Sequence, residues 1–191
     1  VPTVIDDHDT DTWAHNVFTF HNVKGTMELE GIELVEAGPA RAVVRVKSSF
    51  GESHLTQDFI LASDSKVLRV KCKAIWQEKF TMLKMSFPVD GDNAENTYEI
   101  PAGFIKRPAN GEEEPTLRWG AVSFDNGERR TLAVLNDSKY SYDCKVNDLR
   151  ITLMRNVIFA DHYSDRPAAD FNFTDEGKQT FEYGIFLCDG E

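Results

Sequence analysis

Residues 67–76 read VLRVKCKAIW, and this stretch decides the fold class. Its apolar side chains stand at every second position, and basic side chains stand between them. Because successive side chains of a β-strand point to opposite faces, the alternation predicts a strand with one face in a core and one face in solvent. We expect Cys72 and Trp76, both on the apolar face, to be core residues.

Similar short runs recur on both sides of this strand, and turn-forming sequences such as Asp90-Gly91-Asp92 separate them. No segment keeps a helical period over three turns. About ten strands at intervals of about a dozen residues indicate an antiparallel β-sandwich. We therefore expect an all-β, antiparallel fold in a single domain over residues 1–191. The other expected strands cover residues 31–36 (where Ile32 and Leu34 share a face), 41–47, 55–62, 83–87, 118–124, 131–135, 149–155 and 178–187.

The composition limits the partners that the chain is expected to bind. Its 191 residues include 41% hydrophobic residues, enough to bury about 70% of the unfolded surface without disulfide support. The formal net charge is −11. Nucleic acids and anionic membranes attract clusters of Lys and Arg, so we expect neither a nucleic acid nor a membrane as a partner.

The cysteines and the start of the chain indicate its setting. Cys72, Cys144 and Cys188 are odd in number and lack the spacing of a metal site. Since the sequence also shows no secretory signal and no long apolar run, a reducing, cytoplasmic location is favoured. The chain starts at Val1 rather than at Met, so we expect a fragment cut from a larger protein.

Residues 5–15, IDDHDTDTWAH, gather carboxylates and imidazoles around Trp13. Such groups bind metals, but the spacing of a calcium loop is incomplete, because its glycine is missing and Phe18 stands in place of the bidentate glutamate. Two interpretations stay open. One is an acidic surface turn packed under Trp13. The other is the rim of a sugar site, in which Asp9, Asp11 and Trp13 would contact the sugar.

Residues 132–143, LAVLNDSKYSYD, lead from a buried strand into a dense polar cluster. Asn and Asp side chains bond their own backbone in turns, which gives the cluster a purely structural explanation. Polar groups at the end of a strand also face ligands or neighbouring domains. Both interpretations stay open for the four side chains Asn136, Asp137, Lys139 and Tyr140.

No catalytic motif accompanies these two clusters. The sequence has no GxSxG, no HExxH and no glycine-rich phosphate loop. Glycoside cleavage uses two carboxylates that flank the scissile bond, but 32 acidic residues leave such a pair unidentified. The run Glu112-Glu113-Glu114 is expected to be a solvated charge run.

Several segments form an ordered set across nearly the whole chain: 9–13 (DTDTW), 35–42 (VEAGPARA), 74–78 (AIWQE), 83–84 (LK), 87–89 (FPV), 98–103 (YEIPAG), 107–108 (RP), 113–115 (EEP), Trp119, 132–143 and 149–155 (LRITLMR). Each is weak by itself, but their order and spacing are specific. Together they resemble the C-terminal β domain of family 38 glycoside hydrolases, the α-mannosidases, and most of all its bacterial branch. Ser141 departs from this pattern, since glycine is usual there, so a turn that needs a positive φ would be strained or rebuilt.

The resemblance implies a β super-sandwich related to the galactose-mutarotase-like fold. It also implies a parent enzyme that hydrolyses α-mannosides with retention, by means of an Asp nucleophile and a zinc ion. In that family these groups lie in an N-terminal α/β domain and a helical bundle, and no segment here reads as either. We therefore assign no catalytic residue, metal ligand or cofactor to this chain. Its expected partners are those two domains and a mannose-containing oligosaccharide, with a homo-oligomer left open.

Three functions remain in competition. The first is the C-terminal domain of a cytoplasmic, bacterial-type α-mannosidase, which buttresses the catalytic domain, shapes part of the substrate cleft and is inactive alone. The second is a stand-alone carbohydrate-binding sandwich with Trp13, Trp76 and Trp119 as stacking platforms. The third is a purely structural interaction domain.

Overall fold

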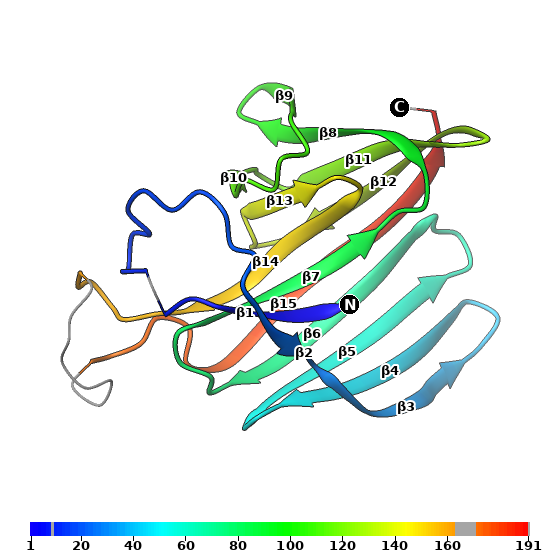
Figure 1. The fold of residues 1–191 in the computed structure, drawn as a ribbon. Coiled ribbons are helices and arrows are strands. Elements are labelled where there is room, and N and C mark those ends of the chain that lie inside the picture. Colours follow the sequence, from blue (N-terminus) through cyan, green and yellow to red (C-terminus); the bar gives the residue numbers. More distant parts are fainter. Residues whose placement is uncertain (9, 163–170, 191) are drawn as a thin grey trace.

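The computed structural model describes residues 1–8, 10–162 and 171–190, which form fifteen β-strands and no helix. Figure 1 shows that the strands lie in two sheets. One sheet has the order β10-β13-β14-β7-β1-β2, that is Glu114–Pro115, Ser141–Lys145, Asp148–Asn156, Thr81–Pro88, Pro2–Asp6 and Val23–Thr26. The other has the order β3-β4-β5-β6-β15-β12-β11-β8-β9, that is Glu28–Ala37, Arg41–Phe50, Ser53–Ala62, Val67–Trp76, Gly177–Asp189, Glu128–Asn136, Trp119–Asn126, Asp92–Ile100 and Gly103–Arg107.

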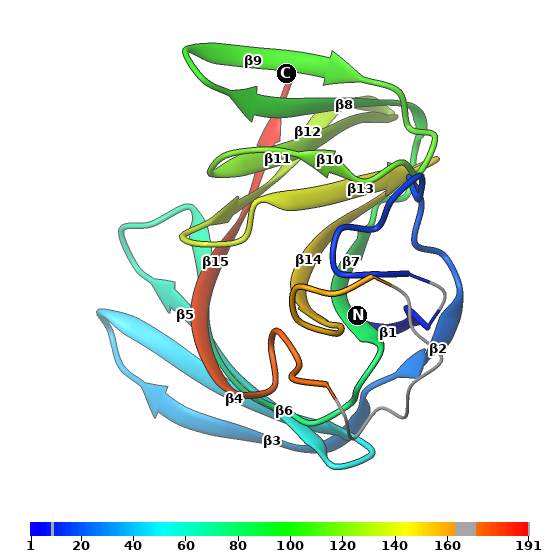
Figure 2. The same ribbon diagram turned by 90° about the vertical axis from the view of Figure 1, so that its left-hand side faces the viewer.

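Every pairing between neighbouring strands is antiparallel, as the sequence predicts. The nine-stranded sheet curves around the six-stranded one (Figure 2). The main hydrophobic core combines side chains of both sheets, including Trp76 and Val122 from the larger sheet and Leu83, Ile151 and Leu153 from the smaller. Apolar burial between the layers is thus the main stabilising force of the fold.

The alternation predicted for β6 is confirmed. Cys72 and Trp76 are 5% and 0% exposed, and the basic side chains between the buried positions reach solvent. The Trp76 indole N–H donates to the backbone oxygen of Glu78 at 3.1 Å, so its polar atom is satisfied inside the protein. β6 lies between β5 and β15, which places this strand in the interior of the larger sheet.

Six strands, β1, β2, β8, β9, β10 and β13, fall outside the expected runs. β8 reads DNAENTYEI and β13 reads SYDCK, with few apolar residues in either. They form strands because neighbours on both sides supply backbone hydrogen bonds, which sequence alternation does not reveal. Each nevertheless buries one tyrosine, and the rings of Tyr98 and Tyr142 meet edge to face with centroids 6.3 Å apart.

The larger sheet has an apolar edge at β3. Ile32 and Leu34 share a face, as their spacing predicts, but they are 65% and 63% exposed. They pair with Val46 and Val44 of β4. Strand periodicity is therefore present here without the burial that usually accompanies it.

Two long connections meet at one end of the sandwich. Residues 7–22 join β1 to β2, and residues 157–176 join β14 to β15. Figure 1 shows the described parts of both connections, in dark blue and in orange, on the same side of the molecule. No helix in the described ranges is long and apolar enough to cross a membrane.

Candidate functional site

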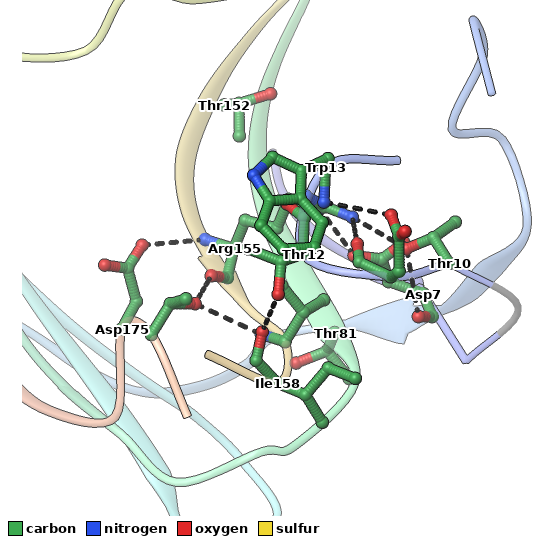
Figure 3. A network of polar contacts seen from close by, with 12 residues as sticks. Asp7, Thr10, Thr12, Trp13, Thr81, Thr152, Arg155, Ile158 and Asp175 are labelled. Atoms are coloured by element: carbon green, nitrogen blue, oxygen red, sulfur yellow. Dashed lines mark hydrogen bonds and ion pairs between the residues drawn. The ribbon is translucent and has the colours of Figure 1, made fainter. Parts of the chain in front are cut away.

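Arg155, near the end of β14, holds the first connection in place. Its guanidinium donates to the Asp7 carboxylate at 2.8 Å and to the Thr10 hydroxyl at 2.7 Å. It also donates to the backbone oxygens of Asp11 and Thr12, each at 2.8 Å (Figure 3). The Asp7 side chain is fully buried, so this is a desolvated ion pair with several supporting hydrogen bonds.

The second connection is attached to the same point. The Arg155 backbone N–H donates to the Asp175 carboxylate at 2.9 Å. The Thr12 hydroxyl bonds the backbone oxygens of Ile158 and Asp161. Segments that are far apart in the sequence are therefore fixed against one another around Arg155 and Thr12, as Figure 3 shows.

Asp11 is the centre of a cluster of ring side chains on this end. One carboxylate oxygen, Oδ1, accepts the backbone N–H of Trp13 at 2.9 Å. The other, Oδ2, lies 2.7 Å from His15 Nδ1 and 2.9 Å from His162 Nδ1. Burial acts to raise the pKa of Asp11, but the hydrogen bonds from His162 and His15 outweigh it and hold the pKa well below its usual range.

The Trp13 indole is 52% exposed and packs beside the two imidazoles. Its ring centroid lies 4.9 Å from that of His162 and 5.8 Å from that of His15. The two imidazoles stack with centroids 5.3 Å apart. The structure thus brings the predicted residues Asp11 and Trp13 together, whereas Asp9 lies outside the described residues. Sequence reasoning missed His162, because only the fold brings it to Asp11.

The turn between β12 and β13 contains the second predicted cluster. The Asn136 amide donates to the Leu117 backbone oxygen at 3.1 Å and to the Tyr142 hydroxyl at 3.0 Å. Its oxygen accepts the Lys139 backbone N–H at 2.7 Å. The Asp137 carboxylate accepts the Ser138 hydroxyl at 2.8 Å. Asn136 and Asp137 therefore stabilise the turn itself, in agreement with the structural interpretation.

Lys139 and Tyr140 are presented by this turn. Tyr140 is 56% exposed, and the Lys139 ammonium lies 4.7 Å from the centroid of the Phe181 ring. Burial holds the pKa of Lys139 below its ordinary value, although the charges of Asp175 and Asp137 act to raise it. Asp175, whose charge acts on Lys139, also accepts the Arg155 backbone N–H, so it links this turn electrostatically to the connection after β14.

A second polar network, on the outer side of the smaller sheet, was not predicted. Lys84 of β7 is fully buried and binds the carboxylates of Glu113 and Asp143, the latter at 2.6 Å. Asp143 also accepts Arg150 Nε at 2.8 Å. Burial raises the pKa of Asp143 more than the charges of Lys84 and Arg150 lower it. The prediction that Glu113 is solvated is wrong, because this side chain is only 12% exposed and pairs with Lys84.

The covering segments explain how these charges become buried. The His21 ring accepts Arg150 at Nδ1, 2.6 Å away, and lies 2.9 Å from the Gly111 backbone oxygen at Nε2. Gly111 has a φ of +81°, and a Cβ there would lie 2.4 Å from His21 Nε2, so glycine is required. Ser141 begins β13 and donates to Glu113 at 2.6 Å, so this position serves in the network rather than in a left-handed turn. Lys84, Asp143 and Arg150 come from three neighbouring strands, and only the pairing of these strands shows that the three charges lie together.

The chain matches the model of the glycosyl hydrolases family 38 C-terminal domain over residues 6–163. It is 26% identical over 191 residues to "Alpha-mannosidase G" of Dictyostelium discoideum, covering 92% of this chain and 16% of the relative. It is 26% identical over 142 residues to human "Alpha-mannosidase 2C1", covering 70% of this chain and 12% of the relative. The chain thus spans less than a fifth of the length of these curated relatives.

Solved structures show the same fold. A glycosyl hydrolase family 38 protein from Enterococcus faecalis superposes with a TM-score of 0.77 at 15% identity, covering 98% of this chain and 26% of that protein. An α-mannosidase from Enterococcus faecalis V583 gives the same TM-score and identity. The match covers 98% of this chain and 25% of that protein. The expected antiparallel β-sandwich of this family is confirmed. Because the family model matches most of its length, this chain belongs to the glycosyl hydrolase family 38 C-terminal domain family.

Proposed function

We propose that residues 1–191 form one domain at the C-terminal end of a retaining α-mannosidase, where they buttress the catalytic domain and shape part of the substrate cleft. Family membership and the names of the relatives support this role. The observation that carries it is the attachment of both long connections to Arg155, at one end of the sandwich. Loops on a rigid scaffold are where proteins place their functional contacts.

The catalytic nucleophile and the zinc ion of the parent enzyme are proposed to lie in its N-terminal and helical domains. Retaining glycosidases need two accessible carboxyl groups about 5–5.5 Å apart. Glu113 and Asp143 lie close together, but both bind Lys84 in a buried network. They are therefore committed to holding the sheet and its covering segments together.

The predicted residues divide into two roles. Asn136 and Asp11 accept backbone N–H groups of their own loops, and Asp137 accepts the Ser138 hydroxyl. Trp13, Lys139 and Tyr140 keep side chains that are at least partly exposed. We place these presented groups against the catalytic domain or the mannose-containing substrate. Asp9 is included in the proposal through its place in the sequence beside Asp11.

The experiment is Lys139→Ala in the full-length enzyme, assayed on an aryl α-mannoside. We expect a lower kcat/KM in a variant that stays folded, because Lys139 contacts β15 only through the face of the Phe181 ring and lies otherwise in the turn. Lys106→Ala is the matched control, since Lys106 pairs with Glu95 on the surface of β9 and β8. If Lys139→Ala has the kinetics of the wild type, the 136–140 turn has a structural role only.

The cellular setting is proposed from weaker features. Cys72, Cys144 and Cys188 are all free thiols, which supports a reducing, cytoplasmic location. A bacterial-type enzyme is proposed from the resemblance of the ordered segments alone. The exposed apolar residues of β3 would be covered by a neighbouring domain or by a second copy of the enzyme.

A stand-alone carbohydrate-binding module is the second candidate. The exposed Trp13 ring beside the Asp11 carboxylate favours it, whereas Trp76 is fully buried and cannot serve as a platform. Titration of the chain with mannose, followed by tryptophan fluorescence, separates the two functions. Saturable binding that is lost in Trp13→Ala would support the module, and an unchanged signal would leave the supporting domain as the function.

A further inference from the structure

Three side chains that are separate in the sequence present ligand atoms to one point. Asp11 and His15 lie in the connection after β1, and His162 lies in the connection after β14. Their nearest donor atoms all lie within 4.8 Å of one another. The two imidazoles reach Asp11 Oδ2 through Nδ1, at 2.7 and 2.9 Å.

Two imidazole nitrogens and a carboxylate oxygen form the donor set of a first-row transition metal. Zinc binds these groups at about 2.0–2.2 Å, usually with four ligands, and three protein ligands leave a position for water. At such bond lengths neighbouring ligand atoms stand about 3.3–3.5 Å apart, so the two Nδ1···Oδ2 distances need to open by roughly 0.4–0.8 Å. The imidazoles have the freedom to do so, because the His15 and His162 side chains are 59% and 70% exposed.

The carboxylate is held ready for this role. Asp11 is 7% exposed, and its Oδ1 accepts the Trp13 backbone N–H, which turns Oδ2 towards the imidazoles. The backbone oxygen of Asp11 accepts Arg155 at 2.8 Å. Supporting bonds of this kind orient metal ligands and raise affinity. Trp13 packs against both rings and covers one side of the cluster.

We propose that Asp11, His15 and His162 bind a divalent transition-metal ion such as zinc, which ties the connection after β1 to the connection after β14. The donors are nitrogen and oxygen, which favours zinc, cobalt or nickel over calcium and magnesium. The bound ion holds Trp13 in a fixed place at the end of the sandwich. Binding of the ion is independent of which substrate the enzyme takes.

The test is calorimetric titration of the metal-stripped chain with zinc chloride. We expect one equivalent to bind, and His15→Ala and His162→Ala each to weaken binding by about tenfold or more. His54→Ala is the matched control, because His54 is an exposed histidine that lies beside Glu30 on other strands. Zinc should also raise the Tm of the wild type more than that of His162→Ala.

Cobalt provides an independent readout that needs no variant. The wild-type chain should show the visible bands of nitrogen and oxygen coordination without a thiolate band, and bound cobalt should broaden the NMR signals of His15 and His162 but not of His54. The proposal is overturned if the wild type binds no stoichiometric metal, if both histidine variants keep full affinity, or if His54→Ala weakens binding as much as they do. Far-UV circular dichroism checks that each variant is folded.

Discussion

Two cations with buried carboxylate partners, one fully buried and one partly exposed, organise the polar parts of this domain. Arg155 binds Asp7 and the backbone of the first connection, and Lys84 binds Glu113 and Asp143 on the outer side of the smaller sheet. A buried ion pair adds little stability compared with an apolar packing, but removing one partner leaves an uncompensated charge in the interior. These residues therefore determine where the loops lie more than how stable the core is.

Arg155→Met should lower the free energy of unfolding by about 3–5 kcal/mol, because Asp7 would stay buried without its partner. Urea denaturation of the two proteins measures the difference. Arg41→Met is the matched control, since Arg41 and Glu36 form an exposed, solvent-screened pair whose loss should change stability little. Equal losses in the two variants would show that Arg155 is not an organising residue.

Glu113 should make stability depend on pH. Burial acts to raise its pKa, but the Lys84 charge and the hydroxyls of Ser141 and Thr152 outweigh burial and leave the pKa below its ordinary value. A lowered pKa in the folded state adds stability that is present above about pH 4.3, the unfolded value, and is lost as the pH falls through the folded pKa.

The prediction is that Glu113→Gln is less stable than the wild type at pH 7 and that the gap narrows from about pH 4 downwards. Urea titrations at a series of pH values between neutral and acid provide the measurement. A gap that stays constant over this range would mean that Glu113 is not charged in the folded protein.

The strands differ in how well they can be predicted from the sequence. β6 alternates cleanly because one face meets the core and the other meets water, and its bounds are those the sequence predicts. In β7 the residues from Thr81 to Met85 are all buried, since the network around Lys84 lies under the covering segments. Charge at that position is typical of a solvated face, so only the fold shows that it is buried.

Trp76→Ala should lower the free energy of unfolding by about 3–5 kcal/mol, because a fully buried indole would be replaced by a cavity between the sheets. Its neighbour Ile75, which is 40% exposed on the opposite face of β6, is the control. Ile75→Ala should cost less than about 1 kcal/mol. Similar losses for both would contradict the assignment of the two faces.

The candidate site was predictable only in part. Residues adjacent in sequence, such as Asp11 with Trp13 and Asn136 with Lys139, could be selected because polar clusters stand out beside strands. The third donor, His162, follows β14 and is far from Asp11 in the sequence. Its role as a ligand can be recognised only in the fold, where it lies beside Asp11. The sequence assigned no metal ligand to this chain, and the juxtaposition of His15 with His162 is the reason for proposing one.

The molecule as a whole is a two-layer sandwich (Figure 2), and its proposed functional contacts lie at the end where both long connections meet Arg155. The antiparallel sheets supply rigidity, and the loops at that end supply exposed groups such as Trp13 and Tyr140. Since the chain spans 16% of one curated relative and 12% of another, most of a protein of that size lies in other domains. The central claim is that this domain frames a glycosidase site and does not contain it.

Hydrolysis of an aryl α-mannoside by the 191-residue chain alone, with zinc present, tests this claim most directly. We predict a rate equal to that of the protein-free blank at every chain concentration, while the full-length enzyme turns the same substrate over. Release of the aryl group above the blank, in proportion to the concentration of the chain, would contradict it.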